Sequence, residues 1–491
     1  MKKTKILISG MIDLQTIGRQ VVGFVGALLH DDRNEIYLDE LWFHDDTMKT
    51  LEEIWGKELV KNVKRSTELP KNYEYDFMIY PWIFGYAFSP KFAETLKNNA
   101  KVKVCYPVYD GSVPPLEWIP TINEYFDICV CPSDYCAHNL RRYGVTVDCF
   151  GLELVVLIDG FSKLNKKVHK KLRFGCLSAS ENRKNLPLLI ESFKKAFSDT
   201  DDVELVLKTM NRNDAFASLD DLRALVNEKD KNIILETNFL NHAEMTDLIS
   251  SIDIYVNPQK TVGFYTSSIE MMALGVPQIL SDIPVHREVE KFIKADNNII
   301  FVSHTQMEPE FHTAFDYRLL GARFQGNTDD YAKALRYIYE NKDRFLTKEL
   351  MEERKKAAFD FFNKTIDKYN QLVHPGHVSI SNRAHIEGDV FFMSKKLSDK
   401  YEKIYEDLTV ENIPDNFVET VYKEEGNKIF QTIEAISVRD QKLYLDHHNQ
   451  TDKYLQKIQN LSIKKDIKVP RFLYKIFKLY SKIKHKKHKG K

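Results

Sequence analysis

The sequence predicts an α/β protein built from two doubly wound domains that face one cleft. Short apolar runs alternate with longer amphipathic stretches over about the first 300 residues, and the runs fall into two successive sets. Alternation of this kind is typical of a parallel sheet covered by helices, so two sets indicate two sheets. Because ligands of such sheets bind beyond the carboxyl ends of the strands, two facing domains would share one site.

The first set of runs predicts an N-terminal Rossmann-like domain over residues 1–155. Its expected strands are 5–9, 77–80, 102–106 and 128–132. The second set predicts another Rossmann-like domain over residues 156–345, after a join near residues 150–170. Its expected strands are 172–176, 204–208, 232–235, 254–257 and 278–281.

The rest of the chain is expected to be mainly helical. Closing helices are predicted over 346–373 and a charged helical extension over 374–469, which offers a surface for oligomerisation. Residues 470–491 contain nine Lys or Arg and no acidic residue, with apolar residues at helical spacing. This pattern predicts a basic amphipathic tail that binds an anionic membrane surface, and packing of its apolar stripe on the extension is the alternative.

Composition excludes several classes of protein. The 43% hydrophobic and 29% charged content of 491 residues is that of a soluble globular chain. Basic and acidic residues balance at 71 each, which argues against a nucleic-acid partner. No apolar run reaches the roughly 18 residues of a membrane span, and the N-terminus reads as a strand rather than an export signal. We expect a cytoplasmic protein, peripheral at the inner face of the cell membrane if it is membrane-bound.

The cysteines are expected to be structural thiols of a reducing compartment rather than metal ligands. They are Cys105, Cys129, Cys131, Cys136, Cys149 and Cys176. We expect alternation along the strand at 128–132 to point Cys129 and Cys131 to opposite faces, which is poor geometry for a shared metal. The acidic run at 199–202 reads as a solvated turn, so no metal site is predicted.

A cation pair follows the first strand of the second domain. Arg183 and Lys184 lie in a polar loop between the strand ending near Cys176 and a helix that begins near Leu186. Two fixed cations beside a helix N-terminus suit a diphosphate, although a solvated charge pair is the alternative. In the N-terminal loop, Gly18 permits close backbone approach to phosphates, and an ordinary helix-start glycine is equally compatible with the sequence.

A second segment carries a carboxylate at the start of a helix. A strand ends at Asn257, a loop containing Gly263 follows, and a helix begins near Ser267 with Glu270 in its first turn. A carboxylate there can accept hydrogen bonds from ribose hydroxyls, and backbone N–H groups at Ser267 and Ser268 suit phosphate. For Glu270 alone, stabilisation of the helix N-terminus is the alternative.

Together these motifs resemble glycosyltransferase family 4, whose members have the two-domain GT-B fold. The segments Val262-Gly263-Phe264-Tyr265 and Glu270-Met271-Met272-Ala273-Leu274-Gly275-Val276-Pro277 occupy the places of the family patterns Glu-Gly-Phe-Gly and Glu-Ala-Met-Ala-x-Gly-x-Pro. Arg183-Lys184-Asn185 resembles the basic pair that neutralises the donor diphosphate, and Leu205 to Thr209, with Lys208, resembles the next strand. Residues 107–135 resemble the acceptor-side domain.

The resemblance implies a metal-independent hexosyltransferase that moves a sugar from a nucleotide-sugar donor to a glycan or lipid-linked acceptor with retention at the anomeric carbon. No cofactor besides the donor is implied. Arg183 and Lys184 would stabilise charge on the leaving diphosphate. The implied donor-binding residues are Gly18, Lys208, Gly263, Phe264, Ser267, Ser268 and Glu270. Assembly of bacterial surface polysaccharide, either lipopolysaccharide or capsule, is the implied setting.

One departure from the family pattern raises a rival hypothesis. The family carries two glutamates eight positions apart, of which the first contacts the donor sugar, and Val262 stands in that place. Valine cannot accept a sugar hydroxyl. The alternative is therefore a catalytically inactive subunit that binds or scaffolds a sugar-transfer complex. A third reading, an NAD-dependent oxidoreductase, is disfavoured because no Gly-x-Gly-x-x-Gly follows the first strand.

Overall fold

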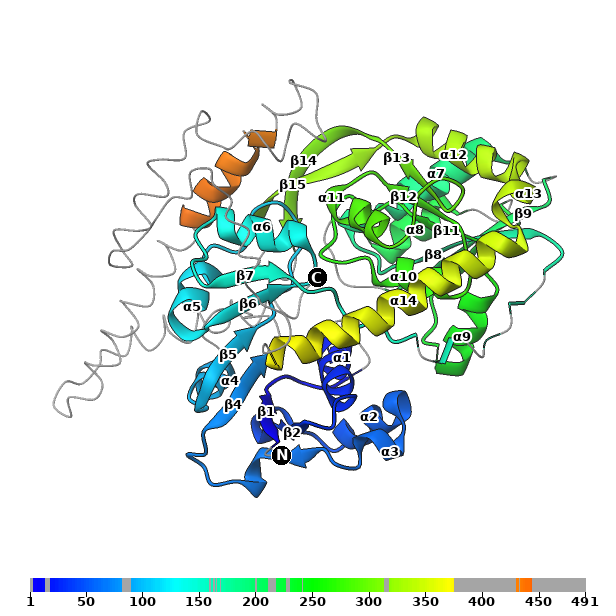
Figure 1. Ribbon diagram of the computed structural model, residues 1–491. Helices are drawn as coiled ribbons and strands as arrows, with labels where there is room; N and C mark the ends of the chain where they lie inside the picture. The colour runs from blue at the N-terminus through cyan, green and yellow to red at the C-terminus, as the bar shows by residue number, and fades with distance from the viewer. Residues whose placement is uncertain are drawn as a thin grey trace, which may run out of the picture. The chain divides into compact units, whose positions relative to one another are not determined.

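The computed structural model describes residues 3–374 and 430–443, except 14–17, 82–89, 159, 162–163, 165, 168, 199–200, 211–217, 227–229, 241, 313–317 and 432. The first domain is a seven-stranded sheet in the order β3-β2-β1-β4-β5-β6-β7 (Figure 1). Its strands are β1 (Thr4–Ile8), β2 (Asn34–Leu38), β3 (Lys64–Arg65), β4 (Tyr75–Tyr80), β5 (Ala100–Cys105), β6 (Ile128–Cys131) and β7 (Asp148–Gly151). All neighbouring strands are parallel.

Helices connect these strands, as a parallel sheet requires. They are α1 (Gly18–Leu29), α2 (Thr47–Trp55), α3 (Lys57–Val60), α4 (Pro90–Leu96), α5 (Trp118–Tyr125) and α6 (Asp134–Arg142), with short 3-10 turns η1 (Glu40–Trp42) and η2 (Ser66–Glu68). Ile6, Leu7 and Ile8 are almost completely buried, because this strand is covered on both faces. α1 packs closely at Gly26, where a Cβ atom would lie 1.9 Å from the Trp55 ring.

The second domain is a six-stranded parallel sheet in the order β10-β9-β8-β11-β12-β13. Its strands are β8 (Leu172–Leu177), β9 (Val203–Lys208), β10 (Ile233–Glu236), β11 (Ile254–Asn257), β12 (Gln278–Ser281) and β13 (Ile299–Val302). Its helical segments are η4 (Asn182–Lys184), α7 (Leu186–Ala196), α8 (Leu219–Leu225), α9 (His242–Ser250), α10 (Thr266–Ala273), α11 (Pro284–Arg287), η5 (Glu288–Lys291), α12 (Thr328–Glu340) and α13 (Lys342–Phe345). The two expected doubly wound sheets are thus confirmed.

An antiparallel hairpin, which the sequence analysis did not predict, lies between β13 and α12. It consists of β14 (His304–His312) and β15 (Arg318–Gly326). The hairpin meets a first-domain loop: the Val113 amide donates to the Leu320 carbonyl at 3.1 Å, and the Ala322 amide donates to Ser112 Oγ at 3.0 Å. Gly321 has φ 82°, and a Cβ there would lie 2.2 Å from Ser112 Oγ, so this contact requires glycine.

A long helix ties the two sheets together. Helix α14 (Lys348–Val373) packs on both α10 and α1, and Figure 1 shows it in yellow. Near its start, the fully buried Arg354 donates to the carbonyls of Gly275, Asn297 and Phe345 at 3.0, 2.8 and 2.7 Å. Near its end, the Tyr369 hydroxyl donates to the Glu153 carbonyl at 3.1 Å. Polar contacts therefore fix this helix to both domains.

Of the predicted extension, residues 430–431 and 433–443 are described, and they are helical. The first half of this helix belongs to the compact unit Met1–Val438, where the Glu434 carboxylate forms a bidentate pair with Arg142 at 3.0 and 2.6 Å. The Phe430 ring stacks on Phe324 of β15. The second unit, Arg439–Lys491, is described only as far as residue 443. The predicted basic tail, 470–491, lies outside the described residues.

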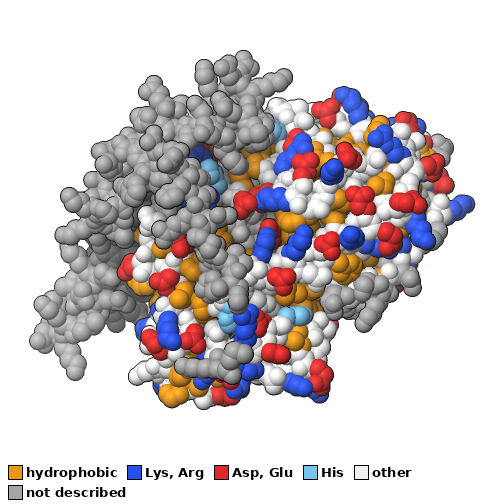
Figure 2. Space-filling model, viewed as in Figure 1, with side chains coloured by type: hydrophobic (Ala, Val, Ile, Leu, Met, Phe, Trp, Pro, Cys, Tyr) orange, Lys and Arg blue, Asp and Glu red, His pale blue; other side chains and the backbone are white. Residues whose placement is uncertain are grey.

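Charge is evenly distributed over the surface in view. Figure 2 shows Lys and Arg side chains interspersed with Asp and Glu, as the balanced composition predicts. Over the described ranges, no helix combines the length and the apolarity that a membrane span needs.

Candidate active site

The predicted cation pair lies at the carboxyl end of the central strand of the second sheet. Strand β8 ends at Leu177, and η4 carries Arg183 and Lys184 directly before α7. Asn185 makes the transition into the helix with a left-handed backbone of φ 57°. Asparagine tolerates this conformation better than most residues, which allows the tight turn. The expected order of strand, basic loop and helix is present.

Arg183 is held by two carboxylates, one from each domain. Its Nη2 lies 2.7 Å from Glu181 Oε2, and its Nη1 lies 3.1 Å from Asp110 Oδ2 of the first domain. Only 16% of the Arg183 side chain is exposed. Burial alone would lower the pKa of Arg183, but the two carboxylates outweigh that effect and raise it. The guanidinium is therefore a fixed positive charge, oriented before any ligand arrives.

Lys184 lies beside Arg183 in the same turn. Its Nζ donates to Gln259 Oε1 at 3.0 Å. Burial and the neighbouring charge of Arg183 lower the pKa of Lys184 to about 8. The backbone N–H of Gln259 approaches Asn257 Oδ1 at 3.4 Å, and Asn257 contacts the buried His286 of α11. The segment that follows β11 therefore supplies the contact of this lysine.

Two further cations, neither of them predicted from the sequence, extend the basic group. The Lys260 amide donates to the Arg183 carbonyl at 2.8 Å, and its Nζ contacts Asn182 Oδ1 at 3.2 Å and the Glu308 carboxylate. Arg323 of β15 pairs with Glu308 at 3.1 Å and with the buried Glu310 at 3.0 Å. The position of Lys260 just after a strand end was a usable signal. Arg323 lies in a hairpin with no sequence motif.

The loop that contains Val262 lies against the first domain. The Gly111 amide donates to Thr261 Oγ1 at 2.9 Å, and a Cβ on Gly263 would lie 2.7 Å from the Tyr109 carbonyl oxygen. Glycine at 263 is therefore needed for the close approach of the two backbones. Val262 is 8% exposed and belongs to the apolar core. The same backbone contact brings Asp110 to Arg183.

Phe264 and the helix that follows it are largely internal. The Phe264 ring stacks on Tyr265 at 4.3 Å and lies near Phe361 of α14. The helix starts at Thr266, one residue before the predicted start, so Glu270 lies beyond its first turn and the expected first-turn position of Glu270 is wrong. Ser267 is partly exposed, whereas Ser268 is completely buried and its amide already donates to the Tyr265 carbonyl at 3.0 Å. Of the two serines, only Ser267 retains exposure to a ligand.

Glu270 has a protein partner that the sequence did not reveal. Its carboxylate lies 2.6 Å from Arg19 Nη2, and 11% of its side chain is exposed. Arg19 follows Gly18, which is the buried first residue of α1. A Cβ on Gly18 would lie 2.3 Å from Asp13 Oδ1, so this glycine allows a close turn. Glu270 thus joins the second domain to α1.

Lys208 ends β9, directly beside the end of β8 in the sheet register. Its ammonium donates to the Asn238 carbonyl at 2.7 Å, and burial lowers its pKa. The register places Lys208 on the same edge as the Arg183 turn, while its ammonium contacts the loop after β10.

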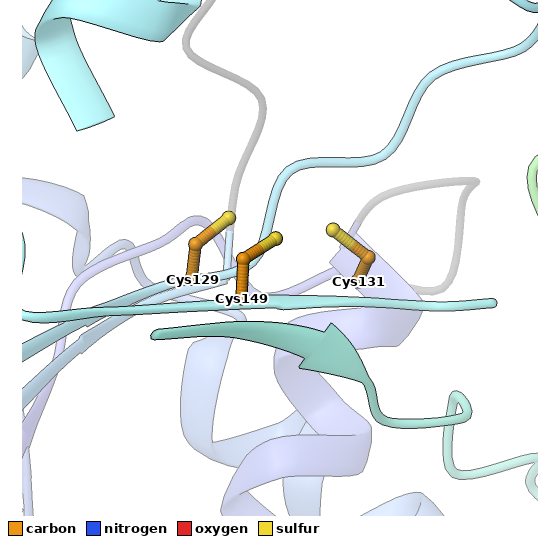
Figure 3. A group of neighbouring side chains, drawn as sticks. All are labelled: Cys129, Cys131 and Cys149. Atoms are coloured by element: carbon orange, nitrogen blue, oxygen red, sulfur yellow. The ribbon is translucent and has the colours of Figure 1, made fainter. Parts of the chain in front are cut away.

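The expectation for Cys129 and Cys131 is wrong. Residues two apart on a strand share one face, because side chains alternate with a period of two. Figure 3 shows Cys129, Cys131 and Cys149 on the same side of the sheet, and their sulfur atoms all lie within 4.8 Å of one another. All six cysteines are free and buried, as expected for reduced thiols.

Comparisons with known proteins agree with this architecture. Residues 171–314 match the family model described as group 1 glycosyl transferases. A search among curated proteins finds no match. The matched segment contains Arg183, Lys184 and Glu270.

Solved structures show the fold. The chain is similar to Anabaena HepE in complex with UDP-glucose, with 13% identity, 76% of this chain and 98% of that chain covered, and a TM-score of 0.52. A glycosyltransferase from Rickettsia africae is 13% identical, with 76% of this chain and 99% of that chain covered and a TM-score of 0.55. The N-terminal domain of Candida albicans trehalose-6-phosphate phosphatase is 10% identical, with 76% of this chain and 97% of that chain covered and a TM-score of 0.50. At these identities the likeness establishes the GT-B fold alone, and that prediction is confirmed.

Proposed function

We propose that this chain is a glycosyltransferase that takes a sugar from a nucleoside diphosphate donor. The observation that carries the proposal is the partly buried pair Arg183 and Lys184 at the carboxyl end of β8, within the segment that matches group 1 glycosyl transferases. Negative charge grows on the diphosphate as the sugar–phosphate bond lengthens. Cations that are already oriented stabilise this charge without reorganisation, and loss of one such group lowers the rate by about 10²–10³-fold.

The donor must compete with carboxylates that now hold these cations. Four cations (Arg183, Lys184, Lys260 and Arg323) are balanced by four carboxylates (Asp110, Glu181, Glu308 and Glu310). An incoming diphosphate adds negative charge to a neutral group, so binding requires that one carboxylate release its partner. Asp110 is the candidate, because it lies on a loop of the opposite domain, whereas Glu181 precedes Arg183 in the same turn.

Asp110 could also take the role of the glutamate that is replaced by Val262 in this chain. The Gly111–Thr261 hydrogen bond and the Gly263–Tyr109 contact bring its loop alongside Val262. We propose that Asp110 exchanges Arg183 for a hydroxyl of the donor sugar when the diphosphate binds. A carboxylate from the first domain would then do what the glutamate does in the resembling family.

A double variant tests this exchange. We expect Asp110→Asn to weaken binding of the nucleotide sugar while binding of the free nucleoside diphosphate is unchanged or tighter. Val262→Glu in the Asp110→Asn background should restore part of the lost affinity. Glu181→Gln is the matched control, since it also removes a carboxylate from Arg183 but is not part of the Tyr109–Gly111 loop that contacts residues 261 and 263. Equal losses for nucleotide and nucleotide sugar in Asp110→Asn would contradict the exchange.

Retention, metal independence and the acceptor class are further parts of the proposal. The resemblance to retaining transferases supports transfer with retention, and the protein cations supply the charge that a metal would otherwise provide. A lipid-linked saccharide of bacterial surface polysaccharide is the proposed acceptor, with the basic tail holding the protein at the membrane. NMR of the product anomer and assays with excess chelator test the first two points.

The rival function is an inactive binding or scaffolding subunit, which Val262 favours. A panel of nucleotide sugars separates the two. The enzyme should release nucleoside diphosphate from at least one donor with chelator present, with or without a lipid-linked acceptor. Tight donor binding with no release across the panel would support the scaffold instead.

A further inference from the structure

Three buried thiols converge on one face of the first sheet. Cys129 and Cys131 belong to β6, and Cys149 belongs to β7. Their exposed fractions are 0%, 0% and 8%, and each pair of sulfur atoms is separated by no more than 4.8 Å. Figure 3 shows that the sulfur of Cys131 leans toward the other two.

The sheet register is the reason for this convergence. Cys149 is the direct partner of Cys129 across β6 and β7, so both side chains stand on the same face. Cys131 shares that face because it lies two residues further along β6. On the other side of β6, Cys105 of β5 is also in register with Cys129 and is completely buried. Four of the six cysteines therefore occupy one small area of three neighbouring strands.

The dimensions suit a metal ion that prefers sulfur. Three atoms that lie within 4.8 Å of one another leave a point no more than about 2.8 Å from each, close to the zinc–thiolate distance of about 2.3 Å. A small inward movement of the side chains would complete the approach. Thiolate ligands select soft or borderline ions such as Zn²⁺ or Cu⁺ over Mg²⁺ or Ca²⁺.

A counter-charge is present beside the thiols. Arg141, in the last turn of α6, donates from Nη1 to the Cys149 carbonyl, and its guanidinium also lies next to the Cys149 sulfur. Thiolates in an apolar core need compensation by positive charge, because burial of an unpaired charge is strongly unfavourable. A divalent ion together with Arg141 would supply that compensation.

We propose that Cys129, Cys131 and Cys149 bind one thiophilic d¹⁰ cation of the Zn²⁺ class. On binding, each coordinating thiol loses its proton to solvent and forms a sulfur–metal bond, with no change of oxidation state. The bound ion would cross-link β6 to β7. Its role would be structural, since all three thiols are buried inside the first domain.

Zinc titration of the reduced, metal-free full-length protein tests the proposal. We expect one Zn²⁺ per chain by elemental analysis after competition with a chelator, and Co²⁺ in its place should give the near-ultraviolet thiolate-to-metal band. At free Zn²⁺ a hundred times its dissociation constant, Tm should rise by about 5 °C. The triple variant Cys129→Ala/Cys131→Ala/Cys149→Ala should lose all three signals, because it lacks the thiolate ligands. It should still fold, because alanine keeps the site apolar.

Cys176→Ala is the matched control, since Cys176 is a buried free cysteine of the other sheet. It should bind Zn²⁺ as the unaltered protein does. The proposal is overturned if the unaltered protein takes up no stoichiometric Zn²⁺ and shows no cobalt band. It is equally overturned if the folded triple variant still takes up stoichiometric Zn²⁺ and shows the cobalt band. Neither outcome depends on glycosyltransferase activity, so this site and the proposed function fail or stand separately.

Discussion

Raising the pH from 7 to 9 is expected to weaken nucleoside diphosphate binding by about tenfold through Lys184. Its pKa is lowered to about 8 by burial and by Arg183, against 10.5 for an ordinary lysine. A lysine with a lowered pKa is charged below that value and neutral above it. About nine-tenths of Lys184 is therefore protonated at pH 7 and about one-tenth at pH 9. If only the charged form binds the diphosphate, affinity falls in the same ratio as the pH rises.

Calorimetry with a nucleoside diphosphate at pH 7, 8 and 9 measures this slope. Lys184→Arg is the matched variant, because a guanidinium stays protonated throughout this range. Its affinity for the nucleoside diphosphate should therefore not change with pH through residue 184. Titration of the nucleobase affects both proteins equally and cancels in their ratio. Proton uptake on binding at pH 8.5, seen as a dependence of the enthalpy on the buffer, should occur only with Lys184 present. The same slope in both proteins would refute the assignment of Lys184 to the diphosphate.

Four other outcomes follow from the contacts. Arg354→Met leaves three buried carbonyls without their donor and should lower the free energy of unfolding, measured by urea denaturation, by about 3–5 kcal/mol. Lys356→Met, at an exposed position of the same helix, should change it little. Equal effects of the two variants would contradict the role given to Arg354. Glu434→Ala, which strands the buried Arg142, should destabilise by a similar amount in thermal unfolding; an unchanged Tm would mean the 430–443 helix contributes nothing. If the Glu270 carboxylate binds the ribose, Glu270→Ala should weaken nucleotide binding and Arg19→Ala should not. Equal losses of affinity in calorimetry would mean that the ion pair only stabilises the structure. The full-length protein should co-sediment with anionic liposomes in low salt and a chain ending near residue 468 should not; equal sedimentation of both would remove the membrane role of the tail.

The parts of the fold that could be predicted depend on local patterns. Parallel strands buried on both faces read as continuous apolar runs, so both sheets were recognisable from segments such as 254–257 and 278–281. The basic turn at Arg183 was visible because strand, polar loop and helix follow one another directly. Positions along the chain therefore predicted the place of Arg183 and Lys184 after the end of a strand.

The partners of the site residues could not be predicted, because they are distant in sequence. Glu270 is 251 residues from Arg19, and no motif connects the two. The β14–β15 hairpin places charged residues such as Glu308 and Arg323 where a strand pattern would have apolar ones, since they pair with each other and with Lys260. The error at Cys129 and Cys131 was of another kind. Side chains alternate along a strand, so residues two apart point to the same face, and these two were expected on opposite faces.

The central claim is that Arg183 and Lys184 hold the donor diphosphate of a sugar transfer. Its most direct test is the rate of nucleoside diphosphate release from the best donor of the panel, compared between the unaltered protein, Arg183→Ala, Lys184→Ala and the exposed control Lys356→Met. We predict a decrease of about 10²–10³-fold in each of the first two variants, with folded protein by circular dichroism, and no decrease in the control. Turnover that stays within a few-fold of the unaltered rate in both variants would contradict the claim.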